Sequence, residues 1–204
     1  MTMLHRQLRP AIVLTVALCI ITGLIYPAVV TGLARTLFPR RSAGSLIVGA
    51  DGAPIGSALI GQAFARPEYF HPRPSAAGAG YDDTLSGGSN LGPTSARLNT
   101  LVTARVDSVV AQDGGVKGDI PSDMVTASAS GVDPDISPAN AFLQVARVAR
   151  ARHADSAAVR ALVDRHVQGR QFGVFGEPRA NVLQLNLDLD RSFPLRTSAE
   201  RGDR

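Results

Sequence analysis

The sequence predicts an α+β (mixed α/β) domain carried on a single N-terminal transmembrane helix. Three observations predict it: an uncharged apolar segment over residues 11–34, alternating helix-type and strand-type patterns after it, and connections rich in glycine and proline. The 204 residues allow one domain with an appendage and are too few for two full-sized domains. With 45% hydrophobic and 19% charged residues, the composition excludes a disordered chain.

The apolar segment 11–34 is long enough to cross a bilayer. As a helix rising ~1.5 Å per residue it reaches roughly 36 Å, against a hydrocarbon core of ~30 Å. Eighteen of its 24 residues are apolar, whereas one central charge would cost ~2.5–3.5 kcal/mol. We therefore expect residues 1–10 to form a short N-terminal extension, 11–34 the transmembrane helix, 35–191 the folded domain and 192–204 a flexible C-terminal tail.

A cleaved signal peptide is the alternative to a retained anchor. Arg6 and Arg9 would form its basic region, and Gly32-Leu33-Ala34 is an acceptable cleavage site. The apolar core of a signal peptide runs ~7–15 residues, and this segment is longer, so a retained anchor is favoured. The two arginines before the segment nearly balance the three after it, which are Arg35, Arg40 and Arg41. Charge alone therefore leaves the orientation of the helix in the membrane open.

Small or kink-prone side chains recur every fourth residue along this anchor. The row comprises Ala11, Thr15, Cys19, Gly23, Pro27 and Thr31. A row of this kind lets two membrane helices approach closely, although small residues are also frequent in membrane helices generally. We expect a helix-packing face formed by Ala11, Thr15, Cys19 and Gly23.

The first part of the domain is predicted to be a hairpin followed by a long loop. Two strands, Ser45–Val48 and Ile55–Ile60, flank an Asp-Gly turn. The loop over 66–93 contains four prolines and five glycines after residue 77, and ordered loops of this length are usually functional or flexible. Two further strands are expected at Met124–Ser130 and at 183–190, where leucines alternate with polar residues.

Three helices are predicted from capping signals. Thr94 or Ser95 can cap a helix that runs to about Gln112. Ser137-Pro138 starts a second helix, which ends near Arg152, and Asp155 can cap a third through His166. The apolar residues of the second helix are expected to face inward: Phe142, Val145, Ala146 and Ala149.

Composition and motif spacing predict neither a catalytic nor a metal site. The single cysteine, Cys19, excludes a disulfide scaffold and a cysteine-based zinc cluster. Basic residues are scattered among aspartates rather than gathered into a stripe, so nucleic acid is not expected as a partner. The histidines lack the spacing of metal ligands: His71, His153 and His166. The paired aspartates are explained by turns, helix caps or the solvent face of a strand: Asp82, Asp83, Asp133, Asp135, Asp188 and Asp190.

One glycine-rich loop allows two interpretations. Leu85-Ser86-Gly87-Gly88-Ser89 is similar to most of the signature loop of ABC-type ATPases, and such turns can bind phosphate through backbone N–H groups. No GxxxxGK[ST] motif is present, however, and the only lysine is Lys117. We therefore favour a structural or interaction loop formed by Ser86, Gly87, Gly88, Ser89 and Asn90. Its glycines would be needed for positive φ or for close backbone contact.

Motifs along most of the chain are similar to those of one family. They are, in order, Thr22-Gly23 and Tyr26-Pro27 in the anchor, the segments 56–62, 69–76, 86–91 and 125–131, Ile136-Ser137-Pro138 leading to Gln144 and 147–152, and finally Gly176-x-Pro178, Asn181-Val182 and 185–190. In these motifs, over roughly residues 8–191, the chain resembles the C subunit of the Kdp high-affinity potassium-transporting ATPase.

The resemblance implies an accessory subunit that is not an enzyme on its own. It implies a single pass through the cell inner membrane, with residues 1–10 cytoplasmic and the large domain extracytoplasmic, in the periplasm. The implied partners, besides the lipid bilayer, are a channel-like potassium-binding subunit, a P-type ATPase subunit and a small single-helix subunit, and these partners carry the potassium. The family is described as a catalytic chaperone that raises ATP affinity, and its nucleotide-contacting glutamine corresponds to Gln144.

Two alternatives to the chaperone function remain open from the residues. One is a purely structural subunit whose outer domain braces the channel-like partner without contacting ATP. The other is an independent periplasmic enzyme or binding protein with a cleaved leader, which would begin at Arg35.

Overall fold

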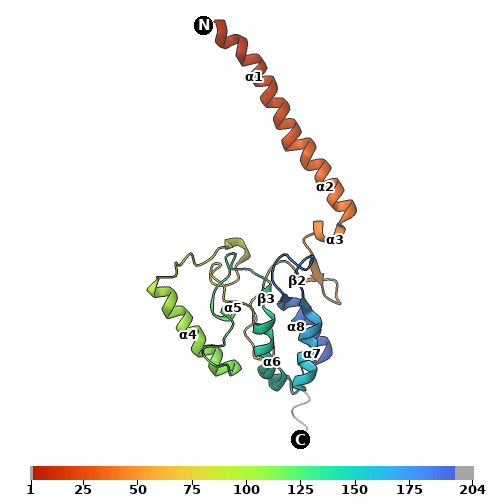
Figure 1. Cartoon of the computed structure of the whole chain (residues 1–204). Coiled ribbons are helices and arrows are strands. Elements are labelled where there is room, and N and C mark those ends of the chain that lie inside the picture. Colours follow the sequence, from red (N-terminus) through yellow and green to blue (C-terminus); the bar gives the residue numbers. More distant parts are fainter. Residues whose placement is uncertain (1, 196–204) are drawn as a thin grey trace. The chain divides into compact units, whose positions relative to one another are not determined.

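The computed structural model describes residues 2–195, and the chain forms two compact units that meet in sequence between Ile55 and Gly56. Its helices and strands are drawn in Figure 1. The predicted flexible tail lies outside the described residues from 196 onward. Within the described part of that range, Ser192 closes the last helix and Phe193 packs against the core.

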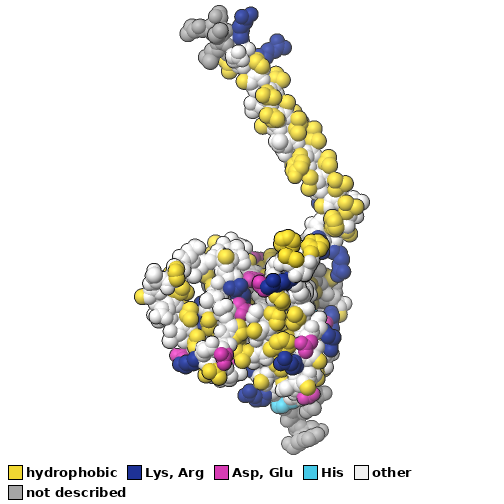
Figure 2. Space-filling view, viewed as in Figure 1, with side chains coloured by type: hydrophobic (Ala, Val, Ile, Leu, Met, Phe, Trp, Pro, Cys, Tyr) yellow, Lys and Arg dark blue, Asp and Glu magenta, His cyan; other side chains and the backbone are white. Residues whose placement is uncertain are grey.

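The N-terminal unit begins with one long helix. It consists of α1 (Thr2–Ile20), the π-helical segment η1 (Ile21–Ile25) and α2 (Tyr26–Leu37). This helix is long and apolar enough to span a membrane, with a mean hydropathy of 2.4 over its most apolar 18 residues, and Figure 2 shows hydrophobic side chains along its length. A short helix α3 (Pro39–Ser42) follows it.

Pro27 explains the π-helical segment. Proline has no N–H, and its ring clashes with the carbonyl four residues earlier. The helix widens by one residue there, so that the Tyr26 N–H donates to the carbonyl of Ile21 rather than to that of Thr22.

The predicted hairpin is present as β1 (Leu46–Val48) and β2 (Pro54–Ser57). The second strand ends earlier than predicted, and both Leu59 and Ile60 lie beyond it and are exposed.

The three helices predicted from capping signals are confirmed within one or two residues. They are α4 (Ala96–Asp113), α6 (Pro138–Arg152) and α7 (Ser156–His166). The side chains of Ser95, Ser137 and Asp155 accept hydrogen bonds from backbone N–H groups of the first turns, as N-caps do. A 3-10 turn η2 (Asp83–Leu85) and a short helix α5 (Ser122–Val125) lie in the connections.

A small antiparallel sheet and the last helix complete the domain. The sheet has the order β3-β5-β4, with β3 (Asp135–Ile136), β4 (Val167–Gln168) and β5 (Arg179–Asn181). Ala180 on the central strand lies opposite Ile136 on one side and Val167 on the other. Helix α8 (Val182–Ser192) follows β5 directly. The core lies between these elements: Phe70, Ile136, Ala141, Val145, Val148, Ala149, Val159, Leu162, Val163, Ala180, Val182, Leu185 and Leu189.

Two predicted strands are wrong. Residues 183–190 belong to α8, because the buried positions follow helical spacing: 182, 183, 185, 186 and 189. Residues 124–130 end α5 and continue as irregular backbone, because serine side chains bind the backbone locally: Ser128 Oγ accepts from the Gly131 N–H at 2.9 Å.

Candidate functional site

A polar stripe on the buried face of α6 is the centre of the candidate site. Asn140, Gln144 and Arg147 are spaced four and three residues apart, so they share one face of the helix. All three are buried, with relative exposures of 1%, 1% and 6%. The family resemblance pointed to Gln144, whereas its two neighbours were missed as parts of one site, although their helical spacing is visible in the sequence.

The side-chain amide of Gln144 uses its full hydrogen-bonding capacity inside the domain. Its Oε1 accepts from the His71 N–H at 2.6 Å and from Arg147 Nη2 at 2.6 Å. Its Nε2 donates to the His71 carbonyl at 3.0 Å and to Asn140 Oδ1 at 2.6 Å. Two acceptor and two donor positions are all that a glutamine amide offers.

The amide of Asn186, on α8, binds the backbone of Phe70 in the way that Gln144 binds the backbone of His71. The Phe70 N–H donates to Asn186 Oδ1 at 2.8 Å, and Asn186 Nδ2 donates to the Phe70 carbonyl at 2.9 Å. Two amides from two helices therefore bind the backbone of consecutive residues, as a neighbouring strand would in a sheet.

Two arginines of α6 bind the backbone of residues 67–69, just before Phe70. Arg147 Nη1 donates to the carbonyls of Pro67 and Tyr69, at 2.7 and 2.9 Å. Arg152 Nε donates to the carbonyl of Glu68 at 2.8 Å. We call residues 67–71 the clamped segment, because side chains from α6 and α8 bind each of its carbonyls. The irregular backbone can bury Phe70 there because the carbonyls of the segment are satisfied.

Arg147 also forms a buried ion pair with the end of α4. Its Nε lies 2.6 Å from Asp113 Oδ1, and the two side chains are 7% and 4% exposed. Removing one member of such a pair costs ~3–5 kcal/mol, because the other charge stays buried without a partner. The pair therefore fixes α4 against α6.

His71 lies at the edge of this site. Burial lowers the pKa of its imidazole below 6.5, and the positive charge of Arg147 lowers this pKa further. Its Nε2 lies 3.0 Å from the Arg66 carbonyl. A cavity of about 180 Å³ adjoins Gln144 and His71, with Arg105 of α4 also in its wall.

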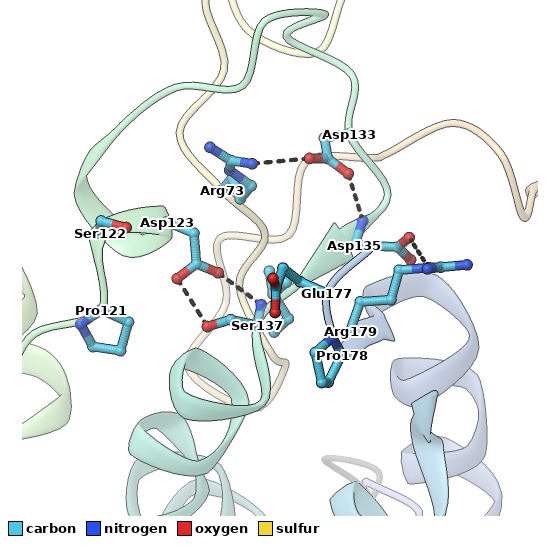
Figure 3. A pocket seen from close by; sticks show the side chains of 11 residues that line it. Arg73, Pro121, Ser122, Asp123, Asp133, Asp135, Ser137, Glu177, Pro178 and Arg179 are labelled. Atoms are coloured by element: carbon cyan, nitrogen blue, oxygen red, sulfur yellow. Dashed lines mark hydrogen bonds and ion pairs between the residues drawn. The ribbon is translucent and has the colours of Figure 1, made fainter. Parts of the chain in front are cut away.

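A larger open pocket of about 500 Å³ includes Arg73, which follows the clamped segment by two residues (Figure 3). Four acidic side chains and two arginines line it: Asp123, Asp133, Asp135, Glu177, Arg73 and Arg179. Arg73 pairs with Asp133 at 3.0 Å, and Arg179 pairs with Asp135 at 3.0 Å. Burial raises the pKa of Asp135 above its usual value, opposed by a hydrogen bond from Asn181 and by the charge of Arg179.

Asp123 in this pocket has a structural task. Its carboxylate accepts from the N–H and the hydroxyl of Ser137, at 2.7 and 2.9 Å, and from Asn140 Nδ2 at 3.0 Å. It thereby holds the first turn of α6 and one end of the polar stripe. Asp133 and Asp135 pair with the two arginines of the wall, whereas Glu177 binds Arg170 outside it. The pocket is therefore a polar recess lined by ion-paired side chains.

The glycine-rich loop 86–90 packs against the segment 128–131. The Gly87 N–H donates to the Ser130 carbonyl at 2.8 Å, and Ser86 Oγ donates to the same carbonyl at 2.9 Å. A Cβ on Gly88 would lie 3.0 Å from the Ala129 carbonyl oxygen, which confirms the close backbone contact. The alternative reason, positive φ, does not hold for either glycine, whereas Asn90 has φ +51°. An interaction role for Ser86, Ser89 and Asn90 stays a prediction.

The other candidate residues are placed as follows. Cys19 is exposed on the anchor, and Gly23 has open space around its Cα, so the predicted packing face with Ala11 and Thr15 stays a prediction. His166 binds Asp188 at 2.8 Å, and Arg152 binds Asp190 at 2.7 Å. Within residues 6–195, no group of three or more potential ligands is arranged to hold a metal ion.

Comparison with known proteins identifies the family. The model of the K+-transporting ATPase C chain, KdpC, matches residues 8–191. A potassium-transporting ATPase KdpC subunit of Gemmatimonas aurantiaca is 62% identical over 186 residues, which cover 91% of this chain and 92% of that protein. The corresponding subunit of Myxococcus xanthus is 54% identical over 85% of this chain and 82% of that protein. That of Rhodospirillum rubrum is 54% identical over 93% of this chain and 98% of that protein. The chain belongs to the KdpC family of potassium-transporting ATPase subunits.

Proposed function

We propose that this chain is a non-catalytic subunit that braces the potassium-transporting ATPase complex from the extracytoplasmic side of the inner membrane. Family membership makes it a subunit of that complex, with an accessory role and other subunits as partners. The N-terminal helix that could span a membrane supports single-pass attachment. Following the resemblance, residues 1–10 face the cytoplasm, and the partners are the channel-like, P-type ATPase and small single-helix subunits.

The observation that carries the bracing role is how the buried polar side chains are used. Gln144, Arg147 and Asn186 direct their hydrogen bonds to the chain's own backbone and side chains. Such a network rigidifies a domain when every member is satisfied. A rigid domain on a membrane helix suits a subunit that holds its partners in a fixed arrangement, while the potassium path and the ATP chemistry belong to those partners.

The second candidate is the chaperone function, in which Gln144 contacts ATP. The observation in its favour is the cavity of about 180 Å³ beside Gln144, with Arg105 in its wall. Small-molecule pockets usually measure ~300–1,000 Å³, so ATP would need this cavity to open. Gln144 would also have to exchange internal hydrogen bonds for those to the nucleotide.

The test compares the detergent-solubilised complex produced with and without this chain. Under the bracing account, the channel-like and P-type subunits separate when the chain is omitted, and the purified chain binds no ATP at millimolar concentration in equilibrium dialysis. Under the chaperone account, those subunits stay together without the chain, and the KM for ATP rises several-fold. In intact spheroplasts, external protease should digest the domain; protection of the domain would overturn the proposed orientation.

A further inference from the structure

The turn between β4 and β5 presents large apolar side chains to solvent. Residues 171–175, which we call the β4–β5 tip, have the sequence Gln-Phe-Gly-Val-Phe. The relative exposures of Phe172, Val174 and Phe175 are 86%, 70% and 66%. Two of the seven phenylalanines of the chain therefore lie in this tip, where they add nothing to the core.

Hydrogen bonds and an ion pair hold the tip in a defined shape. The Gln171 N–H donates to the Phe175 carbonyl at 2.8 Å, and the Phe175 N–H donates back to the Gln171 carbonyl at 2.9 Å. At the base, Arg170 Nη2 binds both carboxylate oxygens of Glu177, at 2.9 and 2.7 Å. The exposed side chains are thus presented by an ordered turn rather than by a loose loop.

Phe172 has a backbone conformation that favours glycine. Its φ is +54°, in the left-handed region where a bulky side chain is strained and glycine is not. Because its ring is also the most exposed of the three side chains, Phe172 stabilises little within this chain. Strained residues that persist without an internal benefit point to a function outside the fold.

We propose that the β4–β5 tip inserts Phe172, Val174 and Phe175 into an apolar pocket on another subunit of the ATPase complex. This inference rests on the accessory role proposed above and names one surface through which it acts. Exposed aromatic anchors that fill a partner's pocket commonly dominate the energy of an interface. A turn of fixed shape binds with less loss of conformational entropy than a flexible one.

The same observations favour a protein pocket over the lipid surface. Arg170 and Glu177 neutralise each other at the base of the tip, so they give it no net positive charge to attract anionic headgroups. The interfacial anchors typical of lipid contact are tryptophan and tyrosine, and the tip contains neither. The chain also has its own membrane helix, so lipid contact by a small turn would add little to its attachment.

The test uses tip variants of the full chain within the detergent-solubilised complex. Phe172→Gly should leave the unfolding temperature of the purified full chain unchanged or raise it, because glycine removes the backbone strain. The same variant should reduce the co-purification of partner subunits several-fold. Phe175→Ser should reduce co-purification similarly. The matched control is Val116→Ser, at an apolar residue that is 71% exposed elsewhere in the domain, and it should change neither quantity.

Each outcome decides the inference. Partner recovery equal to wild type for both tip variants would overturn it. So would variants that keep their partners but bind less tightly to vesicles of anionic phospholipid, because the tip would then contact lipid. Loss of partners only together with a lowered unfolding temperature would show a structural role instead. If the wild-type chain itself retains no partner, the accessory role fails first, and the inference falls with it.

Discussion

Replacing Gln144 by alanine should destabilise the domain strongly, although alanine is a good helix former. The substitution strands four groups that Gln144 alone serves among the contacts described above: the N–H and carbonyl of His71, the Oδ1 of Asn140 and the Nη2 of Arg147. A buried polar group left without a partner costs ~1–3 kcal/mol. Because the adjoining cavity lets water reach part of this site, we expect the lower end, a loss on the order of 2–4 kcal/mol.

For a domain of this size, each kcal/mol shifts the unfolding temperature by ~2–4 °C, so Gln144→Ala should lower it by roughly 5–15 °C. Circular dichroism of the full chain in detergent measures this change. The matched control is Gln112→Ala on α4, whose exposed amide donates to Ser108 Oγ at 3.1 Å and whose loss should stay within ~0.5 kcal/mol. Wild-type stability together with a raised KM for ATP in the assembled complex would refute the internal role and favour nucleotide contact.

Three further predictions concern the glycines, the anchor and pH. Thermal melts should rank Gly131→Ala as more damaging than Gly88→Ala, and Gly87→Ala as nearly neutral. Gly131 has φ +71°, and its Cβ would lie 2.6 Å from the Gly87 carbonyl oxygen, whereas a Cβ on Gly87 meets nothing closer than 4.0 Å. Equal effects of the three substitutions would contradict the packing argument. In the anchor, Gly23→Leu should lower recovery of the complex while Gly32→Leu should not, since both glycines have open surroundings but only Gly23 lies in the predicted packing row. Equal recovery of the two variants would contradict the predicted packing face. Finally, burial lowers the pKa of His71 in the folded state below its unfolded value. The resulting stability is present above pH ~6.5 and is lost as the pH falls from there toward the folded-state pKa. His71→Gln should flatten this dependence in urea titrations at several pH values, and an unchanged dependence would contradict the assignment.

The elements that could be predicted from sequence are those with local signals. Ser95, Ser137 and Asp155 mark helix starts by a chemistry that needs only the next turn, and each does cap its helix. The strands β3, β4 and β5 have two or three residues each, which is too short for a periodic pattern. Helix α8 was mistaken for a strand because leucine at every second position also fills part of a helical stripe.

The candidate site was only partly predictable because its side chains bind distant backbone. Gln144 entered the prediction through the resemblance, whereas the inward face of α6 was expected to be apolar and to include Ala146. The structure confirms Val145 and Ala149 as buried and exposes Ala146. It also buries three polar side chains of the helix: Asn140, Gln144 and Arg147. Their partners lie more than seventy residues earlier for Gln144 and Arg147, a pairing that single-sequence periodicity cannot indicate.

The two proposals together divide stability and assembly between different residues. The groups best suited to recognise a small ligand, the amides and guanidinium groups of α6 and α8, are used to hold the clamped segment. Arg73 follows that segment by two residues and pairs with Asp133 in the open pocket, so the clamp also sets the position of the pocket wall. The β4–β5 tip instead presents two phenylalanines that are mostly exposed, Phe172 and Phe175. We therefore expect substitutions in the clamp to lower the unfolding temperature first and assembly only as a consequence, and substitutions in the tip to lower assembly alone.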